Sequence, residues 1–441
     1  MPSVSIIAAE FQDLVKTAAQ GQGLPDLAPA VFPHELMLAG YIQDIDTTGR
    51  IAVDQIVHGL TKWKPAREAE ANEKLVFEGA DYQGAVDNME AAFLSRRWSD
   101  GLPLVPATRE RVEWILTGTD TPRDKVLTKK FGPRMGAITV GTVAINAAMA
   151  GARPEYLPIL LAAVDVLATE EGLRILSVIA ESAAVFAPAL IVNGPVGKEL
   201  NINSSYGVMG PGWKANATIG RALSLLLING AGAFSGTAGT PRVQGLPGGY
   251  TWCFAENEDA NPWQPLHVES GYSRESSTVT VMPGRGTHGM KIKVGAPEIL
   301  NVIVRAVKGI NINRYGVPWD QLVVLAPEHA QLLAAAGHTK ESIRKYVHEN
   351  ARVSMTEAQG AGMMLWFGEW VNKTANVKDK SMLVPITEKP EDLKIVVAGG
   401  PASGTSALIP GMKRMLTANV DKYKPANWRQ LINAANKELG Y

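Results

Sequence analysis

The chain has 441 residues, with 43 basic and 43 acidic side chains and a formal net charge of zero. A neutral chain has no general attraction to nucleic acid or to an anionic membrane surface, so we expect neither partner. The single cysteine, Cys253, excludes an internal disulfide and any metal site built from several cysteines. No apolar segment reaches the roughly 20 residues of a membrane-spanning helix. The N-terminus has no basic residues before its short apolar run, so we expect a cytoplasmic protein.

The first 62 residues predict a partial α/β unit. Residues 3–8 and 27–32 have the pattern of strands, and residues 10–20 and 47–60 have the pattern of helices. Two strands and two helices are too few to form a complete core. We therefore expect this unit to complete a sheet in another chain or to pack on the main body. Residues 63–79 are interpreted as a linker.

Residues 80–426 predict the main α/β body, and residues 427–441 a C-terminal helix. Strand patterns alternate with helical ones, which predicts mixed or largely parallel sheets joined by Gly-rich loops. The body can be divided into two lobes, 80–290 and 291–426. The sequence shows no internal repeat with a fixed period. The expected strands are 189–192, 277–283, 321–325 and 394–398, and the expected helices are 81–98, 108–116, two within 138–167 that separate near Ala152, 215–229, 299–307, 327–336 and 339–350.

A polar loop follows the strand at 189–192 and precedes the helix at 215–229. Its glycines and asparagines tolerate unusual backbone conformations, and the free N–H groups at a helix start favour negative charge. The loop therefore predicts a binding surface for a small polar or anionic substrate; the alternative is a structural loop that closes a subunit contact. The residues expected to contact substrate here are Asn193, Asn201, Asn203, Ser204, Ser205, Lys214 and Asn216.

Acid–base chemistry is expected from the segment that follows Cys253. Glu256, His267 and His288 are the candidate catalytic residues, because imidazole titrates near neutral pH and both histidines are expected in polar loops. With Glu256 and Glu258, the two histidines could also bind a metal, although no fixed-spacing metal motif is present. A structural role is the alternative for each histidine. The cofactor is left open, with a metal as one possibility.

Two further features concern binding and reactivity. Asn257 is expected to contact substrate, as is Ser403 in the Gly-rich loop 399–404 that follows the strand at 394–398. That loop lacks the Lys-Ser/Thr ending of a nucleotide-binding P-loop. Cys253 lies in an apolar run, which predicts a buried and inert thiol.

Several long segments resemble a bacterial family associated with, or fused to, small UGSC selenoprotein-like domains. They include DGLPLVPAT (100–108), IVNGPVGKELNINSSYGVMGPGWKANATIGRAL (191–223), FAENEDANPWQPLHVESGY (254–272) and IVVAGGPASGTSALIP (395–410). The N-terminal segments GLPDLAPAVFPHE and DQIVHGLTKW resemble the tail of the small UGSC domain, but no thiol or selenol motif precedes them. The resemblance implies that a separate small chain carries the reactive Cys or Sec. Relatives often have Cys where this chain has Ala152.

Three functions are compatible with the sequence. The first is a subunit of an oligomeric two-component enzyme, in which a small UGSC-type or thiol-bearing chain supplies thiol or selenol chemistry, an oxidoreductase reaction by analogy with glycine-reductase-type proteins. The second is a self-contained lyase, hydratase or hydrolase that uses Glu and His side chains. The third is a non-catalytic binding or scaffolding subunit.

Overall fold

The computed structural model describes most of the chain. The described residues are 6–9, 12–21, 27, 29–32, 53–58, 60–61, 75–132, 136–181, 186–233, 245–292, 295–310, 314–360, 366–367, 379, 381–401 and 404–440.

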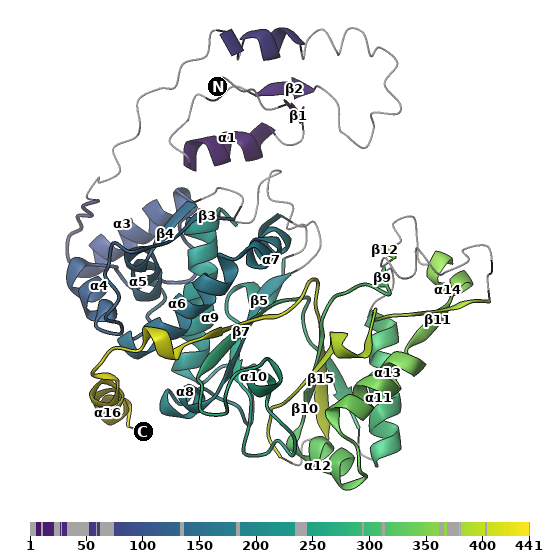
Figure 1. Ribbon diagram of the computed structural model, residues 1–441. Helices are drawn as coiled ribbons and strands as arrows, with labels where there is room; N and C mark the ends of the chain where they lie inside the picture. Colours follow the sequence, from purple (N-terminus) through teal and green to yellow (C-terminus); the bar gives the residue numbers. More distant parts are fainter. Residues whose placement is uncertain are drawn as a thin grey trace.

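Two mixed four-stranded sheets form the centre of the body (Figure 1). Each contains one parallel and two antiparallel strand pairs, which confirms the α/β fold with mixed sheets. The first sheet has the order β16 (Leu416–Asn419), β7 (Thr278–Gly284), β5 (Ala187–Asn193) and β6 (Cys253–Ala255). The second has the order β14 (Leu393–Val397), β10 (Gln321–Leu325), β15 (Thr405–Pro410) and β8 (His288–Lys291).

The two sheets have the same topology and the same register. In each sheet a central strand, β5 or β10, has a parallel neighbour on one side and two successive antiparallel strands on the other. Pro283 of β7 lies opposite Pro188, and Pro410 of β15 lies opposite Gln321. The body is therefore an internal structural repeat. Its corresponding strands are unequally spaced along the chain, so no fixed period is visible in the sequence.

The outer antiparallel strand of each sheet comes from the other half of the chain. β8 follows β7 along the chain but pairs with β15, and β16 follows β15 but pairs with β7. The two connections cross at Gly284 and Gly411, which form a β-bridge. A Cβ on Gly284 would lie 2.8 Å from the Trp252 ring, so this crossing leaves no room for a side chain.

Residues 285–411 are consequently one contiguous insertion that contains the whole second sheet. The first sheet is built from residues before Gly284 and after Gly411. The lobe boundary suggested by the sequence, after residue 290, falls within β8, yet the whole strand belongs to the second sheet. Its pairing also corrects the expectation that His288 lies in a polar loop, because His288 is the first residue of β8. His267 was expected in a polar loop too, and it lies in the short helix α10 (Leu266–Glu269).

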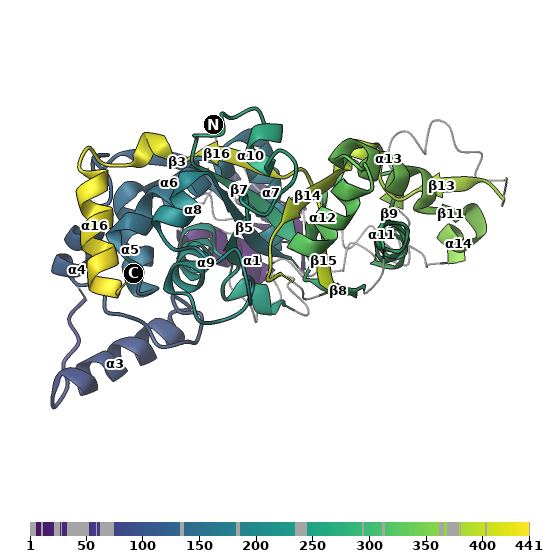
Figure 2. The same cartoon turned by 90° about the horizontal axis from the view of Figure 1, so that it is seen from below.

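The two sheets pack face to face, and helices cover their outer faces (Figure 2). Alternate residues of β5 point to opposite faces of the first sheet: Ile191 packs between the sheets, whereas Leu190 faces the helices. β10 behaves in the same way, with Val324 between the sheets and Val323 facing its own helices. The result is a four-layer helix–sheet–sheet–helix arrangement with a continuous apolar layer in the middle.

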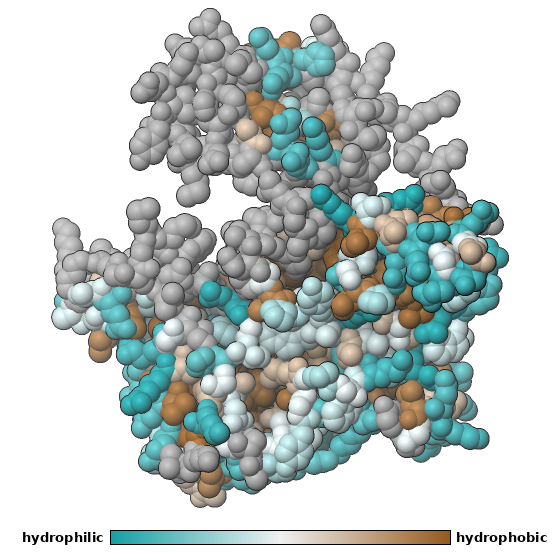
Figure 3. Space-filling model, turned by 180° about the vertical axis from the view of Figure 1, so that it is seen from behind, coloured by the Kyte–Doolittle hydropathy of each residue, from teal (hydrophilic) through white to brown (hydrophobic). Residues whose placement is uncertain are grey.

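Helices α6 (Leu157–Leu167) and α9 (Lys214–Leu226) pack on the first sheet, and α11 (Ala296–Ile310) and α13 (Lys340–Asn350) pack on the second. Two predicted helix starts are confirmed. The Thr108 hydroxyl accepts from Arg111 N at the start of α4 (Arg109–Leu116), and Thr339 forms a capping box with Ser342 at the start of α13. Figure 3 shows hydrophilic and hydrophobic side chains interspersed over one face of the molecule.

The remaining helices are α1 (Gln12–Gly21), α3 (Tyr82–Ser95), α5 (Val140–Met149), α7 (Glu170–Glu181), α8 (Pro195–Glu199), α10 (Leu266–Glu269), α12 (Pro327–Ala335), α14 (Met355–Gly360), α16 (Trp428–Leu439), the 3-10 turns η3 (Pro154–Tyr156), η5 (Pro247–Gly249), η6 (Pro390–Asp392) and η7 (Asp421–Tyr423), and the π-turn η4 (Leu227–Ala231). The remaining strands form two-stranded sheets: β1 (Ile6–Ala8) with β2 (Ala30–Phe32), β3 (Val126–Phe131) with β4 (Gly136–Thr139), β9 (Arg314–Tyr315) with β12 (Trp366–Phe367), and β11 (Arg352–Ser354) with β13 (Leu383–Pro385).

We predict that deletion of residues 412–441 prevents the first half from folding. The deletion leaves one edge of β7 unpaired and removes Val420, Tyr423 and Ile432 from the core. Each large buried side chain contributes about 2–5 kcal/mol, whereas a whole domain is stable by only about 5–15 kcal/mol. Soluble expression and near-UV circular dichroism provide the measurement.

The matched control is deletion of residues 428–441, which removes α16 but keeps β16. This shorter deletion should give a soluble protein with a lower melting temperature. A soluble, cooperatively folded product of the longer deletion would contradict the assignment of β16 to the first sheet.

Candidate functional site

The parallel strands of both sheets end at the same edge of the body. Asn257, just after β6, donates from its main-chain N to Val397 O at 2.7 Å, and Gly399, just after β14, donates to Ser204 O at 2.9 Å. These two bonds hold the loops after β6 and β14 side by side. The carboxyl ends of parallel strands are the usual location of ligand sites in α/β folds.

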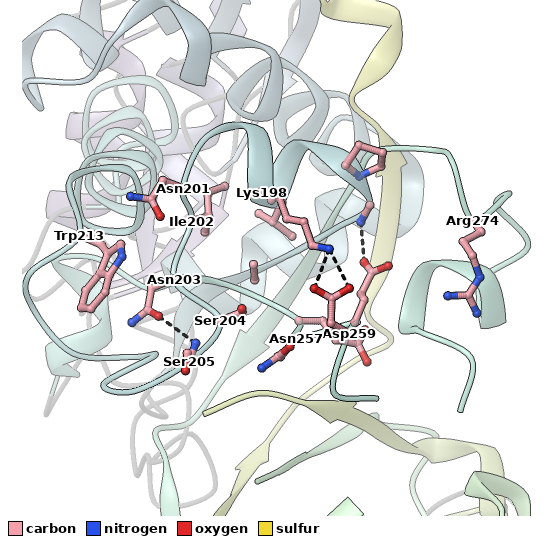
Figure 4. A pocket seen from close by; sticks show the side chains of 17 residues that line it. Lys198, Asn201, Ile202, Asn203, Ser204, Ser205, Trp213, Asn257, Asp259 and Arg274 are labelled. Carbon is pink, nitrogen blue, oxygen red and sulfur yellow. Dashed lines mark hydrogen bonds and ion pairs between the residues drawn. The ribbon is translucent and has the colours of Figure 1, made fainter. Parts of the chain in front are cut away.

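A cavity of about 830 Å³ opens beside these strand ends (Figure 4). The polar loop after β5 forms one part of its wall, and the loop after β6 forms another. Its polar side chains are those of Lys198, Asn201, Asn203, Ser204, Ser205, Trp213, Glu256, Asn257, Glu258, Asp259 and Arg274.

Glu256 lies almost completely buried at the base of this cavity, where its carboxylate joins three segments. It accepts hydrogen bonds from Asn193 Nδ2 at 2.6 Å, Asn261 Nδ2 at 2.8 Å and Leu266 N at 2.8 Å. Val397 N, at the end of β14, is 3.4 Å away. The carboxylate thus links β5 and the loop after β6 to the second sheet.

Burial raises the pKa of Glu256, while the charge of Lys340 and the hydrogen bonds from Leu266 and Asn193 act in the opposite direction. All four hydrogen-bonding groups around the carboxylate are N–H donors. A proton on Glu256 would find no acceptor among them, so this set of donors favours the ionised form. The arrangement gives Glu256 a structural function in the site.

Glu258, rather than Glu256, presents a free carboxylate oxygen. Its Oε1 accepts from Gly194 N at 2.6 Å and from Asn193 Nδ2 at 3.2 Å. Its Oε2 makes no hydrogen bond within the described residues, and the side chain is 17% exposed. Asn193 therefore holds two carboxylates at once, and only Glu258 retains an oxygen that can react with a bound molecule.

His267 is fully buried behind Glu258. Its Nε2 lies 3.3 Å from Arg274 O, and because a carbonyl oxygen only accepts, Nε2 carries a hydrogen. Its Nδ1 has no hydrogen-bond partner in the described structure and lies 3.8 Å from Glu258 Oε1. A buried nitrogen without a hydrogen-bond partner is unusual. The 3.8 Å separation is longer than a hydrogen bond, and the nearest oxygen is the one that accepts from Gly194 N and Asn193 Nδ2.

The polar loop owes its shape to two buried asparagines. Asn216 Oδ1 accepts from Asn203 N at 2.8 Å, and Asn216 Nδ2 donates to Cys253 O at 3.0 Å. Asn203 Oδ1 in turn accepts from Ser205 N. Tyr206 continues the loop and donates its hydroxyl to Pro401 O, which ties the loop to the second half of the body.

The structure separates the predicted site residues into four groups. Asn201, Asn203, Ser204, Ser205, Asn257 and Glu256 line the cavity, and Asn193 and His267 are buried next to it. Lys214, Asn216 and His288 do not line it: Lys214 and His288 are exposed elsewhere, and Asn216 supports the loop from behind. Ser403 lies outside the described residues.

Sequence reasoning gave no role to Arg274 or Lys198, and it named Glu258 only as a possible metal ligand. The signal for Glu258 was present, because it lies in the same acidic cluster as Glu256. The choice between the two depended on which carboxylate is enclosed by N–H donors, and this is a tertiary property. Arg274 is remote from the polar loop in sequence and carried no comparable signal.

Metal and thiol chemistry would need ligand clusters or a reactive cysteine. Within the described residues, no group of three or more His, Cys, Asp and Glu side chains is arranged to hold a metal ion. Cys253 is buried in β6, and burial raises the pKa of its thiol far above the usual range. Its thiol is therefore protonated at physiological pH and is a poor nucleophile.

No family model, curated protein or solved structure matches this chain. The functional assignment therefore rests on the geometry of the site. Over the described part of the chain, no helix has both the length and the apolar character needed to cross a membrane.

We predict that Glu256→Gln destabilises the protein by about 3 kcal/mol, because the new amide NH₂ would face groups that are all N–H donors. Urea unfolding provides the measurement. Glu258→Gln is the matched control, since its remaining oxygen can still accept from Gly194 and Asn193. The control should change stability by less than about 1 kcal/mol. Equal effects of the two substitutions would contradict the distinction between them.

Proposed function

We propose that this protein is a cytoplasmic enzyme that acts on a small polar or anionic organic molecule by acid–base catalysis, in the class of lyases, hydratases or hydrolases. Glu258 is the general base, and the imidazole of His267 lies behind its carboxylate. The observation that carries the proposal is the pairing of a free carboxylate oxygen in the cavity with an unpartnered imidazole nitrogen 3.8 Å from the same carboxylate.

This pairing has the features that general-base catalysis requires. The Glu258 carboxylate is fixed by Gly194 N and Asn193 Nδ2 on one oxygen, so the other oxygen has a defined direction. The proton taken from substrate stays on Oε2 of Glu258 until it returns to the product or to solvent. The imidazole of His267 lies on the other side of the carboxylate, with Nδ1 3.8 Å from Oε1. Neutral amide and hydroxyl groups in the polar loop supply hydrogen bonds that orient a bound molecule.

The proposal predicts that Glu258→Gln lowers turnover by about 10²–10⁴-fold, the usual contribution of a general base. The measurement is incubation of the protein with a mixture of small organic acids, alcohols and amides in D₂O, followed by mass spectrometry of consumed, formed and deuterated compounds. Glu275→Gln, at an exposed glutamate outside the cavity lining, is the control and should match the wild type. Unchanged turnover in Glu258→Gln would overturn the proposal. If the wild type changes no compound, a non-catalytic binding subunit becomes the better description.

A second candidate is the two-component enzyme implied by the resemblance to the UGSC-associated family. It is favoured by the burial of Cys253, because a thiol or selenol step would then need a group from another molecule. The described N-terminal strands β1 and β2 form a two-stranded parallel sheet, which is smaller than an independently stable sheet. A small thiol-bearing chain that adds strands there would complete it.

This candidate predicts a stable complex between the protein and a small Cys- or Sec-containing chain encoded nearby. Native mass spectrometry of the co-expressed chains provides the measurement. A variant that lacks residues 1–62 is the control and should lose the partner but keep the folded body. A homo-oligomer without any small chain, together with turnover by the protein alone, would contradict the two-component enzyme.

A further inference from the structure

Among the described residues that line the cavity, one cation has no carboxylate partner. Lys198 Nζ lies 2.7 Å from an Asp259 carboxylate oxygen, so that pair has no net charge. The guanidinium of Arg274 lines the same cavity and makes no ion pair or hydrogen bond within the described residues. Its N–H groups are therefore available to a bound molecule.

The position of Arg274 is coupled to the proposed acid–base pair. The main-chain O of Arg274 accepts from His267 Nε2 at 3.3 Å, and the turn that carries Arg274 is closed by a hydrogen bond from Ser276 N to Ser273 O. The free cation is thus held on the same short segment that orients the imidazole behind Glu258.

The opposite end of the cavity is neutral. Figure 4 shows Trp213 and Asn201 at one end and Arg274 at the other, with Lys198 and Asp259 between them. The side chains of Asn201, Ser205 and Trp213 make no hydrogen bond within the described residues, so their polar groups are free. Such groups suit hydroxyl or carbonyl oxygens rather than a second charge.

From this distribution of charge we propose that the substrate is a small hydroxylated carboxylic acid. This inference names the substrate class of the proposed enzyme and rests on the proposed function. Its carboxylate binds the Arg274 guanidinium through two parallel N–H···O bonds. Its hydroxyl groups reach toward Asn201, Ser205 and Trp213, and Glu258 faces the carbon chain between the two ends. A phosphate ester fits less well, because its dianion would find only one unpaired cation here.

Isothermal titration of wild-type protein and variants tests this proposal. The probes are glycolate, D-glycerate, L-malate and D-gluconate, with glycerol as the uncharged analogue and glycerol phosphate as the phosphate analogue. At least one of the four acids should bind, and glycerol should not. Arg274→Ala should weaken that binding by about tenfold to a hundredfold. The matched control is Arg305→Ala, an exposed arginine on α11 outside the cavity, which should leave affinity unchanged.

Glu258→Gln separates this inference from the proposed function. Because the substitution leaves Arg274 in place, the acid should still bind to Glu258→Gln even though turnover is lost. Acid binding that depends on Arg274, without any turnover by the wild type, would support the binding class and reject the enzyme. Equal affinity in wild type and Arg274→Ala, absence of binding by all four acids, or preferential Arg274-dependent binding of glycerol phosphate would each overturn the carboxylic acid assignment.

Discussion

The buried carboxylate of Glu256 is the interaction on which the site depends. Hydrogen bonds from the end of β5, the loop after β6 and the end of β14 meet on its two oxygens. A charged group in the interior is tolerated only when its hydrogen-bonding capacity is filled, and here the donors come from both halves of the body. The same constraint fixes Asn193, which in turn orients Glu258. The reactive geometry is therefore a consequence of how one buried charge is compensated.

The crossing of the chain at Gly284 and Gly411 makes this arrangement possible. Because the second half is an insertion with both connections at one point, it can pack its sheet face to face against the first sheet. The carboxyl ends of the parallel strands then meet at a shared edge. At two matched positions only the first copy carries carboxylates: the loop after β6 has Glu256 and Glu258, and the loop after β14 has Ala398 and Gly400. The second copy contributes packing, while the described residues that line the cavity all belong to the first copy.

The polar loop illustrates a division between residues that shape a site and residues that face it. Asn203 and Asn216 direct their side chains to main-chain groups, whereas Asn201 and Ser205 leave theirs free at the cavity. All four are residue types expected in a binding loop. An irregular segment has no helix or strand ladder to satisfy its main-chain N–H and C=O groups. The side-chain amides of Asn203 and Asn216 bond those groups instead, which is why their functions differ from those of Asn201 and Ser205.

The sequence by itself determined the local elements. The strand 321–325 and the start of the helix predicted over 339–350 agree with the structure because periodicity, β-branched residues and capping side chains act over a few neighbouring positions. It also located the polar loop and the acidic cluster. Only the tertiary structure decided that β8 and β16 exchange between the sheets, that Glu256 is enclosed while Glu258 is free, and that His288 lies away from the cavity. These outcomes depend on contacts between residues far apart in the chain, to which local patterns are insensitive.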